Sequence, residues 1–149
     1  MLFRSLYAKK TFTWNGIQQS NRNALLWRNS IYDGLKTGHT EAAGYCLVAS
    51  AQRDGQRLIS AVLGASSTRK RAEETEKLMG YGFRFYDTQT YKKGGEVLAQ
   101  AALWKGKQPS ISVGLLDDMT LTLPKNASRK IEMRLAFDGP IEADRKSVV

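Results

Sequence analysis

Two apolar runs joined by a tight-turn signal constrain the fold of this chain more than any other feature. Residues 44–51 form a nearly continuous apolar run, and residues 57–64 form a second one after Asp54 and Gly55. Asp-Gly favours a two-residue hairpin turn, because both central residues of that turn adopt a positive φ. An unbroken apolar centre is typical of a buried strand. The sequence therefore predicts an antiparallel hairpin, with residues 35–40 as a third antiparallel strand before it.

Residues 67–79 carry the pattern of a helix that packs on this sheet. Ser67 is a suitable N-cap residue, and we expect Gly80 and Gly82 to end the helix because glycine accepts the left-handed conformation. The mostly apolar face consists of Ala72, Thr75, Leu78 and Met79. Opposite charges four residues apart occur at Arg69–Glu73, Lys70–Glu74 and Glu73–Lys77.

The residues before residue 35 carry weaker signals. Aromatic residues alternate around Thr13, which predicts a short strand near residues 12–14. Residues 21–33 read as a loop, apart from Leu25-Leu26-Trp27, which we expect to plug into the core.

The character of the sequence changes near Thr88. Short β-like runs separated by Gly, Pro, Asn and Asp lie at residues 97–99, 101–104, 119–123 and 131–137. The last run alternates apolar and polar residues with a period of two. The sequence thus predicts an α+β protein with a partial antiparallel sheet and packed helix in residues 1–87, followed by a small β-rich domain in residues 88–149.

The charge balance limits the classes of partner and cofactor. The chain has 23 Lys and Arg against 14 Asp and Glu, a net charge of +9, but the basic residues are scattered apart from Arg69-Lys70-Arg71. We therefore expect no nucleic-acid partner. One cysteine, Cys46, and one histidine, His39, provide neither a disulfide nor a metal site, so we expect no metal and no cofactor, with Cys46 as a buried small hydrophobe.

Lys36, Thr37 and Gly38 form the chemically most suggestive motif, on the first predicted strand. Lys-Thr-Gly is one of the motifs of the penicillin-recognising serine enzymes. A lysine supplies a compact positive charge for a carboxylate, and a threonine hydroxyl can donate a second hydrogen bond. Glycine has no Cβ, so a substrate backbone can approach the strand closely. An isolated tripeptide is weak evidence, because it recurs by chance.

The surrounding sequence strengthens the motif. Residues 21–27 read Asn-Arg-Asn-Ala-Leu-Leu-Trp, residues 33–45 contain the motif, and residues 57–64 and 80–85 follow. Together these stretches closely resemble the low-molecular-mass penicillin-binding proteins that are serine-type D-alanyl-D-alanine carboxypeptidases. The resemblance runs from about Phe12 to about Ala143 and covers only the latter part of the family's length.

This resemblance implies a β-lactamase/transpeptidase-like fragment whose site binds the D-Ala-D-Ala end of a peptidoglycan stem peptide. Lys36, Thr37 and Arg22 would hold the terminal carboxylate, with Gly38 beside them, and the backbone N–H of His39 would be one oxyanion-hole donor. β-Lactam antibiotics would use the same contacts. For Arg22, a role as a surface arginine that fixes its loop is an equal alternative.

The same resemblance implies acyl transfer by a serine whose lysine follows three residues later. Ser67 and Lys70 fit that spacing, but in the family the motif comes well before Lys-Thr-Gly, so we expect no catalytic residue in this chain. The nucleophile and its base are expected upstream. The chain alone is expected to be inactive.

The resemblance also implies a location at the periplasm or the outer face of the bacterial inner membrane. The chain carries no signal-peptide pattern, and the membrane-anchoring helix of the family is absent from its sequence. We expect a chain clipped at both ends, with a truncated β-rich domain. The alternatives are a serine β-lactamase fragment, which the β-rich extension disfavours, and a non-catalytic envelope binding module.

Overall fold

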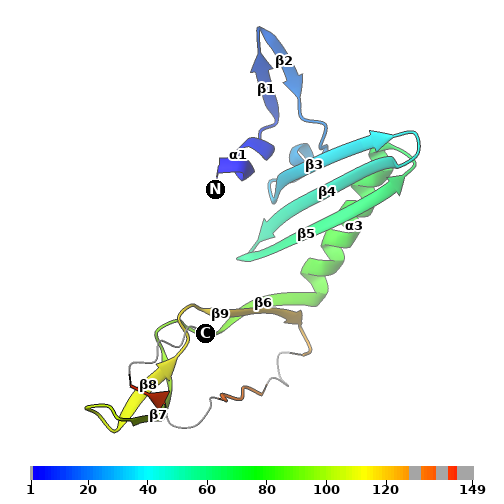
Figure 1. Cartoon of the computed structure of the whole chain (residues 1–149). Coiled ribbons are helices and arrows are strands. Elements are labelled where there is room, and N and C mark those ends of the chain that lie inside the picture. Colours follow the sequence, from blue (N-terminus) through cyan, green and yellow to red (C-terminus); the bar gives the residue numbers. More distant parts are fainter. Residues whose placement is uncertain (1, 128–131, 137–140, 144–149) are drawn as a thin grey trace. The chain divides into compact units, whose positions relative to one another are not determined.

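A computed structural model describes residues 2–127, 132–136 and 141–143 of the 149 residues (Figure 1). The chain forms two compact units, Met1–Asp87 and Thr88–Val149. Helices occur with antiparallel sheets, so the predicted α+β class is confirmed. None of the described helices is both long and apolar enough to cross a membrane.

A three-stranded antiparallel sheet is the centre of the first unit. Its strands are β3 (Tyr32–Thr40), β4 (Gly44–Arg53) and β5 (Gln56–Ala65), in the spatial order β3-β4-β5. The β4–β5 turn has φ = 50° at Asp54 and 80° at Gly55, as the Asp-Gly signal predicts. All three predicted strands are confirmed, and each extends beyond its predicted bounds.

Helix α3 (Thr68–Phe85) lies along one face of this sheet (Figure 1). The Ser67 Oγ accepts a hydrogen bond from the Lys70 backbone N–H at 3.1 Å, which confirms the predicted N-cap. Alternate residues of β4 face the helix, and Leu47 is the largest of them that is buried, with 1% of its surface exposed. The shared core consists of Leu25, Leu26, Tyr32, Leu47, Ala49, Ala51, Ala72, Met79 and Phe83.

The predicted end of α3 is wrong, because Gly80 and Gly82 lie inside the helix. At Gly82 the helix comes so close to β5 that an added Cβ would lie 2.5 Å from the Leu58 Cδ1. The missing side chain at this position therefore serves helix–sheet packing. The helix ends at Phe85, where the chain becomes extended at Tyr86.

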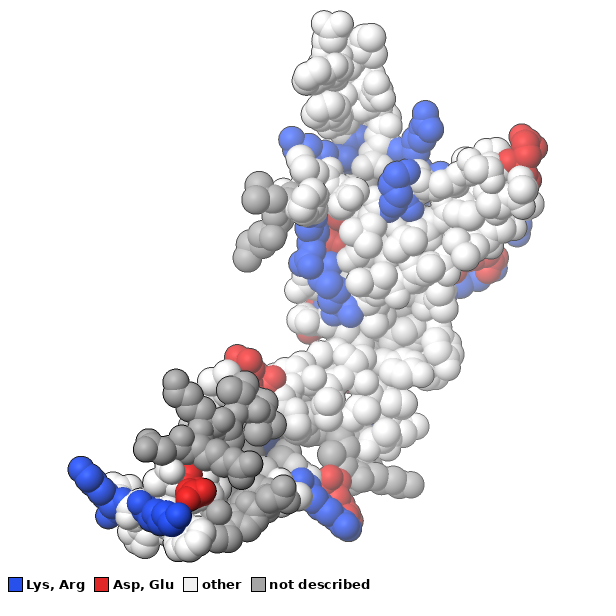
Figure 2. Space-filling model, in the orientation of Figure 1, with Lys and Arg blue, Asp and Glu red and all other residues white. Residues whose placement is uncertain are grey.

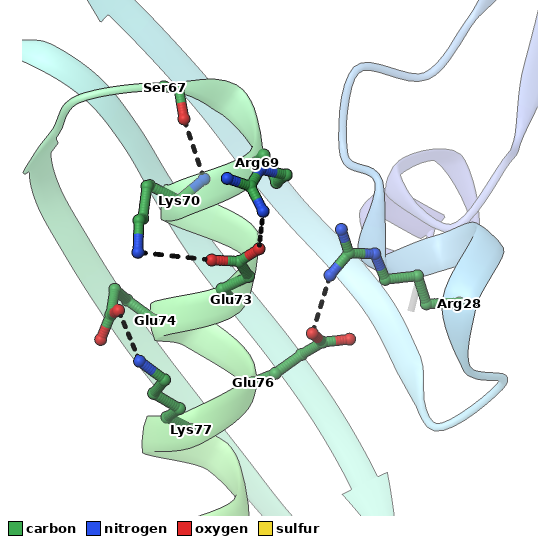
Figure 3. A network of polar contacts seen from close by, with 8 residues as sticks. All are labelled: Arg28, Ser67, Arg69, Lys70, Glu73, Glu74, Glu76 and Lys77. Carbon is green, nitrogen blue, oxygen red and sulfur yellow. Dashed lines mark hydrogen bonds and ion pairs between the residues drawn. The ribbon is translucent and has the colours of Figure 1, made fainter.

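Ion pairs follow the charge pattern of α3 only in part (Figure 3). Arg69 pairs with Glu73 as predicted, but Lys70 also reaches Glu73, and Lys77 pairs with Glu74 at a spacing of three residues. Arg28 pairs with Glu76 at 2.8 Å and so connects the segment before the sheet to α3. Such exposed pairs contribute about 0–1 kcal/mol each, so packing rather than charge holds the helix.

The segment before the sheet is more ordered than the sequence predicted. It contains α1 (Leu2–Tyr7), the hairpin of β1 (Thr11–Trp14) and β2 (Ile17–Ser20), and α2 (Leu25–Arg28). The strand near residues 12–14 is confirmed. The β1–β2 turn consists of Asn-Gly, the same kind of signal as Asp-Gly, with positive φ at both residues.

The predicted burial of Leu25-Leu26-Trp27 holds for the two leucines but is wrong for the tryptophan. Trp27 is 51% exposed, and the Lys10 Nζ lies 5.4 Å from the centre of its ring. In a single helical turn, three consecutive residues point in different directions, so they cannot all enter one core.

The second unit contains short β-strands. Its antiparallel pair β7 (Val97–Trp104) and β8 (Ser110–Gly114) is extended by β10 (Ile141–Glu142), which is parallel to β7. A second, two-stranded sheet joins β6 (Tyr86–Lys92), which begins in the first unit, to β9 (Met119–Pro124). The two runs at residues 97–104 thus form one strand, and the run at residues 119–123 is confirmed.

The predicted strand at residues 131–137 is wrong where it can be compared. Its two ends lie outside the described residues, and the described residues 132–136 form no strand and are exposed. A period of two becomes a strand only where a neighbouring strand offers backbone partners. Residues 132–136 have no such pairing in the described part of the sheets.

We expect Leu47→Ala to destabilise the first unit by about 2–5 kcal/mol, because it leaves a cavity between β4 and α3. The matched control is Leu63→Ala on β5, where the side chain is 72% exposed and the free energy of unfolding should change by less than about 0.5 kcal/mol. Urea unfolding of the full chain measures both values. Equal losses in the two variants would contradict the placement of the core.

Candidate functional site

A cavity of about 570 Å³ opens beside the ends of β3 and β4 in the first unit. Its lining residues are Arg22, Lys36, Thr37, Gly38, His39, Tyr45, Thr68 and Arg71. The five residues that the sequence singled out therefore lie around one space. Tyr45, Thr68 and Arg71 are additional lining residues that the sequence analysis missed.

Strand β3 positions four of these residues in succession. It is an edge strand, paired only with β4 in the described sheet, and this pairing sets Lys36 opposite Val48 and Gly38 opposite Cys46. The Lys36 side chain is exposed, and its Nζ donates a hydrogen bond to the Thr37 carbonyl. An extended peptide can add to such an edge through its backbone, with side chains selecting its end groups.

Gly38 keeps this edge open rather than relieving a clash inside the protein. A Cβ added there would meet only the Cys46 Cβ, at an ordinary 3.8 Å. Cys46 is half-buried, and its thiol donates to the Ala43 carbonyl at 3.4 Å, so the prediction of a buried small hydrophobe is wrong. The residue lies near the start of β4, next to Tyr45, which lines the cavity.

Arg71 connects the segments that surround the cavity. From α3, its Nη1 donates to the carbonyls of Gly38 at 3.2 Å and Cys46 at 3.4 Å, and its Nη2 donates to the Arg22 carbonyl at 3.2 Å. Only 5% of the residue is exposed. Burial lowers the pKa of the guanidinium from its ordinary value, but an arginine remains charged in a protein.

A sequence signal for Arg71 exists, although the residue first reads as part of a basic surface cluster. Arg71 is four residues before Thr75, which is itself four residues before Met79, and all three are buried on one side of α3. A charged residue on a buried helix stripe requires polar partners. That position therefore predicts a structural arginine, though not which carbonyls it binds.

The wall of the cavity is electropositive and partly aromatic. The rings of His39 and Tyr45 lie 4.0 Å apart between centroids, and the Arg71 Cζ lies 5.8 Å from the centroid of Tyr45. None of the eight lining residues is acidic, whereas Arg22, Lys36 and Arg71 are cationic. This composition favours an anionic group such as a carboxylate.

On the face seen in Figure 2, by contrast, Lys and Arg side chains are spread out with Asp and Glu between them. Among the described residues, no group of three or more His, Cys, Asp or Glu side chains could hold a metal ion.

The Ser67–Lys70 pair does not have the arrangement of a nucleophile and its base (Figure 3). The Ser67 Oγ accepts from the Lys70 backbone N–H, while the Lys70 Nζ points to Glu73 at 3.7 Å from its Oε2. Covalent catalysis needs the base within hydrogen-bond reach of the nucleophile. Ser67 therefore serves as the cap of α3.

Comparisons with known proteins point to one group of enzymes. A family model described as D-alanyl-D-alanine carboxypeptidase matches residues 3–67, and one described as penicillin-binding protein 5, C-terminal domain, matches residues 85–147. The chain is 46% identical over 129 residues to D-alanyl-D-alanine carboxypeptidase DacA of Escherichia coli, covering 86% of this chain and 32% of that protein. DacD of Escherichia coli is 38% identical, with coverage of 97% and 39%.

Solved structures agree with this. Penicillin binding protein 5 from Haemophilus influenzae matches with a TM-score of 0.82 at 37% identity, over 94% of this chain and 42% of that one. Penicillin binding protein 6B from Escherichia coli gives 0.65 at 38% identity, over 87% and 36%. The chain thus spans about a third of the length of the curated relatives.

We expect Arg71→Lys to destabilise the first unit by about 2–3 kcal/mol, because an ammonium cannot donate to three carbonyls in the geometry of the guanidinium fork. Arg69→Lys is the matched control, since Arg69 is exposed and paired only with Glu73 in the described contacts. Its effect should stay within about 0.5 kcal/mol. Chemical unfolding followed by circular dichroism would measure both, and a tolerated Arg71→Lys would show that the fork is dispensable.

Proposed function

We propose that this chain, which resembles the C-terminal part of a low-molecular-mass penicillin-binding protein, supplies the carboxylate-binding wall of a serine-type D-alanyl-D-alanine carboxypeptidase. The observation that supports this most is the cationic cavity beside the open edge of β3. A peptide that ends in a carboxylate matches both features, since its backbone is extended and its end is anionic.

In the proposed complex, Lys36, Thr37 and Arg22 hold the terminal carboxylate of the stem peptide. The lysine ammonium contributes a point charge, the hydroxyl of Thr37 contributes a directional hydrogen bond, and Arg22 contributes a planar fork. Charge-assisted bonds of this kind are about twice as strong as neutral ones. Gly38 leaves the strand accessible to the peptide backbone.

The backbone N–H of His39 is the proposed oxyanion-hole donor. Such a donor stabilises the negative charge that develops on the attacked carbonyl oxygen, and the loss of one costs about 3–4 kcal/mol of transition-state stabilisation where it has been measured. The ring of His39 lies 4.0 Å from that of Tyr45 between centroids, and strand pairing sets the two residues opposite each other. β-Lactam antibiotics carry a carboxylate next to a reactive carbonyl, so they would use the same groups.

The proposed reaction is acyl transfer to a serine, followed by hydrolysis of the acyl-enzyme and release of the terminal D-alanine. This chain would contribute binding groups, and the serine and its lysine would lie outside it. We also propose that residues 1–87 are a portion of the transpeptidase-like domain and residues 88–149 the β-rich C-terminal domain. The two matched ranges, 3–67 and 85–147, support that division.

The proposed partners are peptidoglycan stem peptides and β-lactams, at the periplasmic side of the bacterial inner membrane. The match of residues 85–147 to a penicillin-binding protein's C-terminal domain favours this reading over a β-lactamase fragment.

We expect Lys36→Ala to weaken the binding of N-acetyl-D-alanyl-D-alanine by about tenfold or more, because a charge-assisted hydrogen bond to the carboxylate is lost. Lys77→Ala is the matched control, since Lys77 is exposed on α3 and pairs with Glu74. A titration of ¹⁵N-labelled chain, following the amides of Gly38 and His39, measures the dissociation constants. Equal constants for the two variants would exclude the proposed role of Lys36.

We expect a fluorescent penicillin to leave no covalent label on this chain after denaturing gel electrophoresis, because Ser67 lacks a base within reach. Ser67→Ala should give the same blank result while lowering the free energy of unfolding by about 1 kcal/mol through the lost cap. A stoichiometric label that disappears in Ser67→Ala would show that Ser67 is a nucleophile after all.

A further inference from the structure

We infer that Asn23 is a positioning residue that fixes Arg22 against Arg71 and strand β3. The effect of this positioning on carboxylate binding rests on the proposed function. The positioning itself concerns only contacts within the chain. Asn23 lies between Arg22 and α2, outside the motif on β3, and does not line the cavity.

Asn23 is among the most buried polar residues of the described chain, with 1% of its surface exposed. Its Nδ2 donates to the Gly34 carbonyl of β3 at 3.0 Å, and its Oδ1 accepts from the Leu25 backbone N–H at 3.2 Å. One side chain therefore joins the start of α2 to the start of β3. A buried amide that makes both kinds of hydrogen bond fixes its own backbone, because losing either bond leaves a buried polar group unpaired.

The residue on the other side of Arg22 is fixed as well. The Asn21 Oδ1 accepts from the Asn23 backbone N–H at 2.9 Å. The Asn21 Nδ2 donates to the carbonyls of Tyr7 at 3.2 Å and Lys9 at 2.9 Å. Arg22 thus lies between two asparagines, one bound to the end of α1 and the residues just after it, and one bound to β3.

Arg22 itself is attached at its carbonyl, which accepts from the Arg71 Nη2, while Arg71 also binds Gly38 of β3. Asn23 contacts β3 at Gly34, two residues before Lys36, and Arg71 contacts it at Gly38, two residues after. The loop is therefore held to β3 on both sides of Lys36. This double attachment fixes the backbone of Arg22 relative to that of Lys36. In the proposed function, it thereby limits where the two cations can meet a single carboxylate.

A purely structural role for Asn23 would lower stability without changing the site of the molecules that remain folded. Positioning predicts two further effects. Without the Asn23–Gly34 bond, Arg22 should leave Arg71, and the Arg71 guanidinium hydrogens should exchange with solvent faster. The folded variant should also bind a carboxylate less tightly.

The test compares Asn23→Asp and Asn23→Ala with the matched controls Asn29→Asp and Asn29→Ala. Aspartate keeps the acceptor for Leu25 but cannot donate to Gly34. Asn29 is the same residue type at the other end of α2, exposed, and its Oδ1 accepts from the Ile31 N–H at 3.1 Å. Its backbone carbonyl accepts from the Tyr32 N–H of β3, and both substitutions leave that backbone contact in place. Nuclear magnetic resonance of the full chain measures exchange at Arg71 and the dissociation constant for N-acetyl-D-alanyl-D-alanine.

In the Asn23 variants we expect exchange at Arg71 to accelerate about tenfold and the dissociation constant to rise about tenfold, whereas the Asn29 variants should stay within about twofold. Unchanged exchange at Arg71 in folded Asn23 variants would overturn the inference, whatever the ligand does. If Lys36→Ala leaves the binding of N-acetyl-D-alanyl-D-alanine unchanged, the proposed function fails. If exchange at Arg71 nevertheless accelerates in the Asn23 variants, the positioning role of Asn23 stands.

Should neither Asn23 variant fold, the unaltered chain decides the matter. If the contacts act as one unit, the Asn23 Nδ2 hydrogens and the Arg71 guanidinium hydrogens should exchange with similar protection. Exchange at Asn23 more than about tenfold faster than at Arg71 would show that the two contacts open separately, and would overturn the inference.

Discussion

The guanidinium of Arg71 is the interaction on which the geometry of the cavity depends. It donates to carbonyls of Arg22, Gly38 and Cys46, which belong to a loop and two strands. Burying a charge is costly unless it is hydrogen-bonded, and three carbonyls offset that cost here. Because the guanidinium fork is planar and rigid, the position of α3 determines how close the loop and β3 come to each other.

The close contact of α3 with the sheet makes this possible. Gly82 allows the helix to approach β5, and the buried residues of β4 pack beneath it, so the helix can carry Arg71 at its opposite end. The other face of the sheet is different, since Ile59 is 66% and Leu63 72% exposed. The site is therefore built on the packed face and at the β3 edge, and the stability of that packing and the shape of the cavity are coupled.

Local signals predicted the parts of the fold that local chemistry controls. The Asp54-Gly55 turn, the strands around it and the Ser67 cap depend on neighbouring residues, and all were predictable. The position where α3 ends was not predictable, because the glycine at position 82 serves close packing against Leu58 on β5. Five of the eight cavity residues were singled out from the Lys-Thr-Gly motif and the family resemblance. Arg71 and Asn23 instead act through carbonyls 11 to 49 residues away, which no local pattern encodes.

Two kinds of group therefore meet at this site, and they depend on different parts of the sequence. Lys36, Thr37 and Gly38 are consecutive on one edge strand, so their spacing follows from strand geometry alone. Arg22, by contrast, lies in a separate loop that Asn23 and Arg71 attach to β3. In the proposed function, the binding of a carboxylate that contacts both Lys36 and Arg22 would thus depend on tertiary packing as well as on the motif. A chain that kept the motif but lost the packing of α3 would retain the point charge of Lys36 and lose the paired geometry. It would then also lose much of the proposed preference for a terminal carboxylate over any other anion.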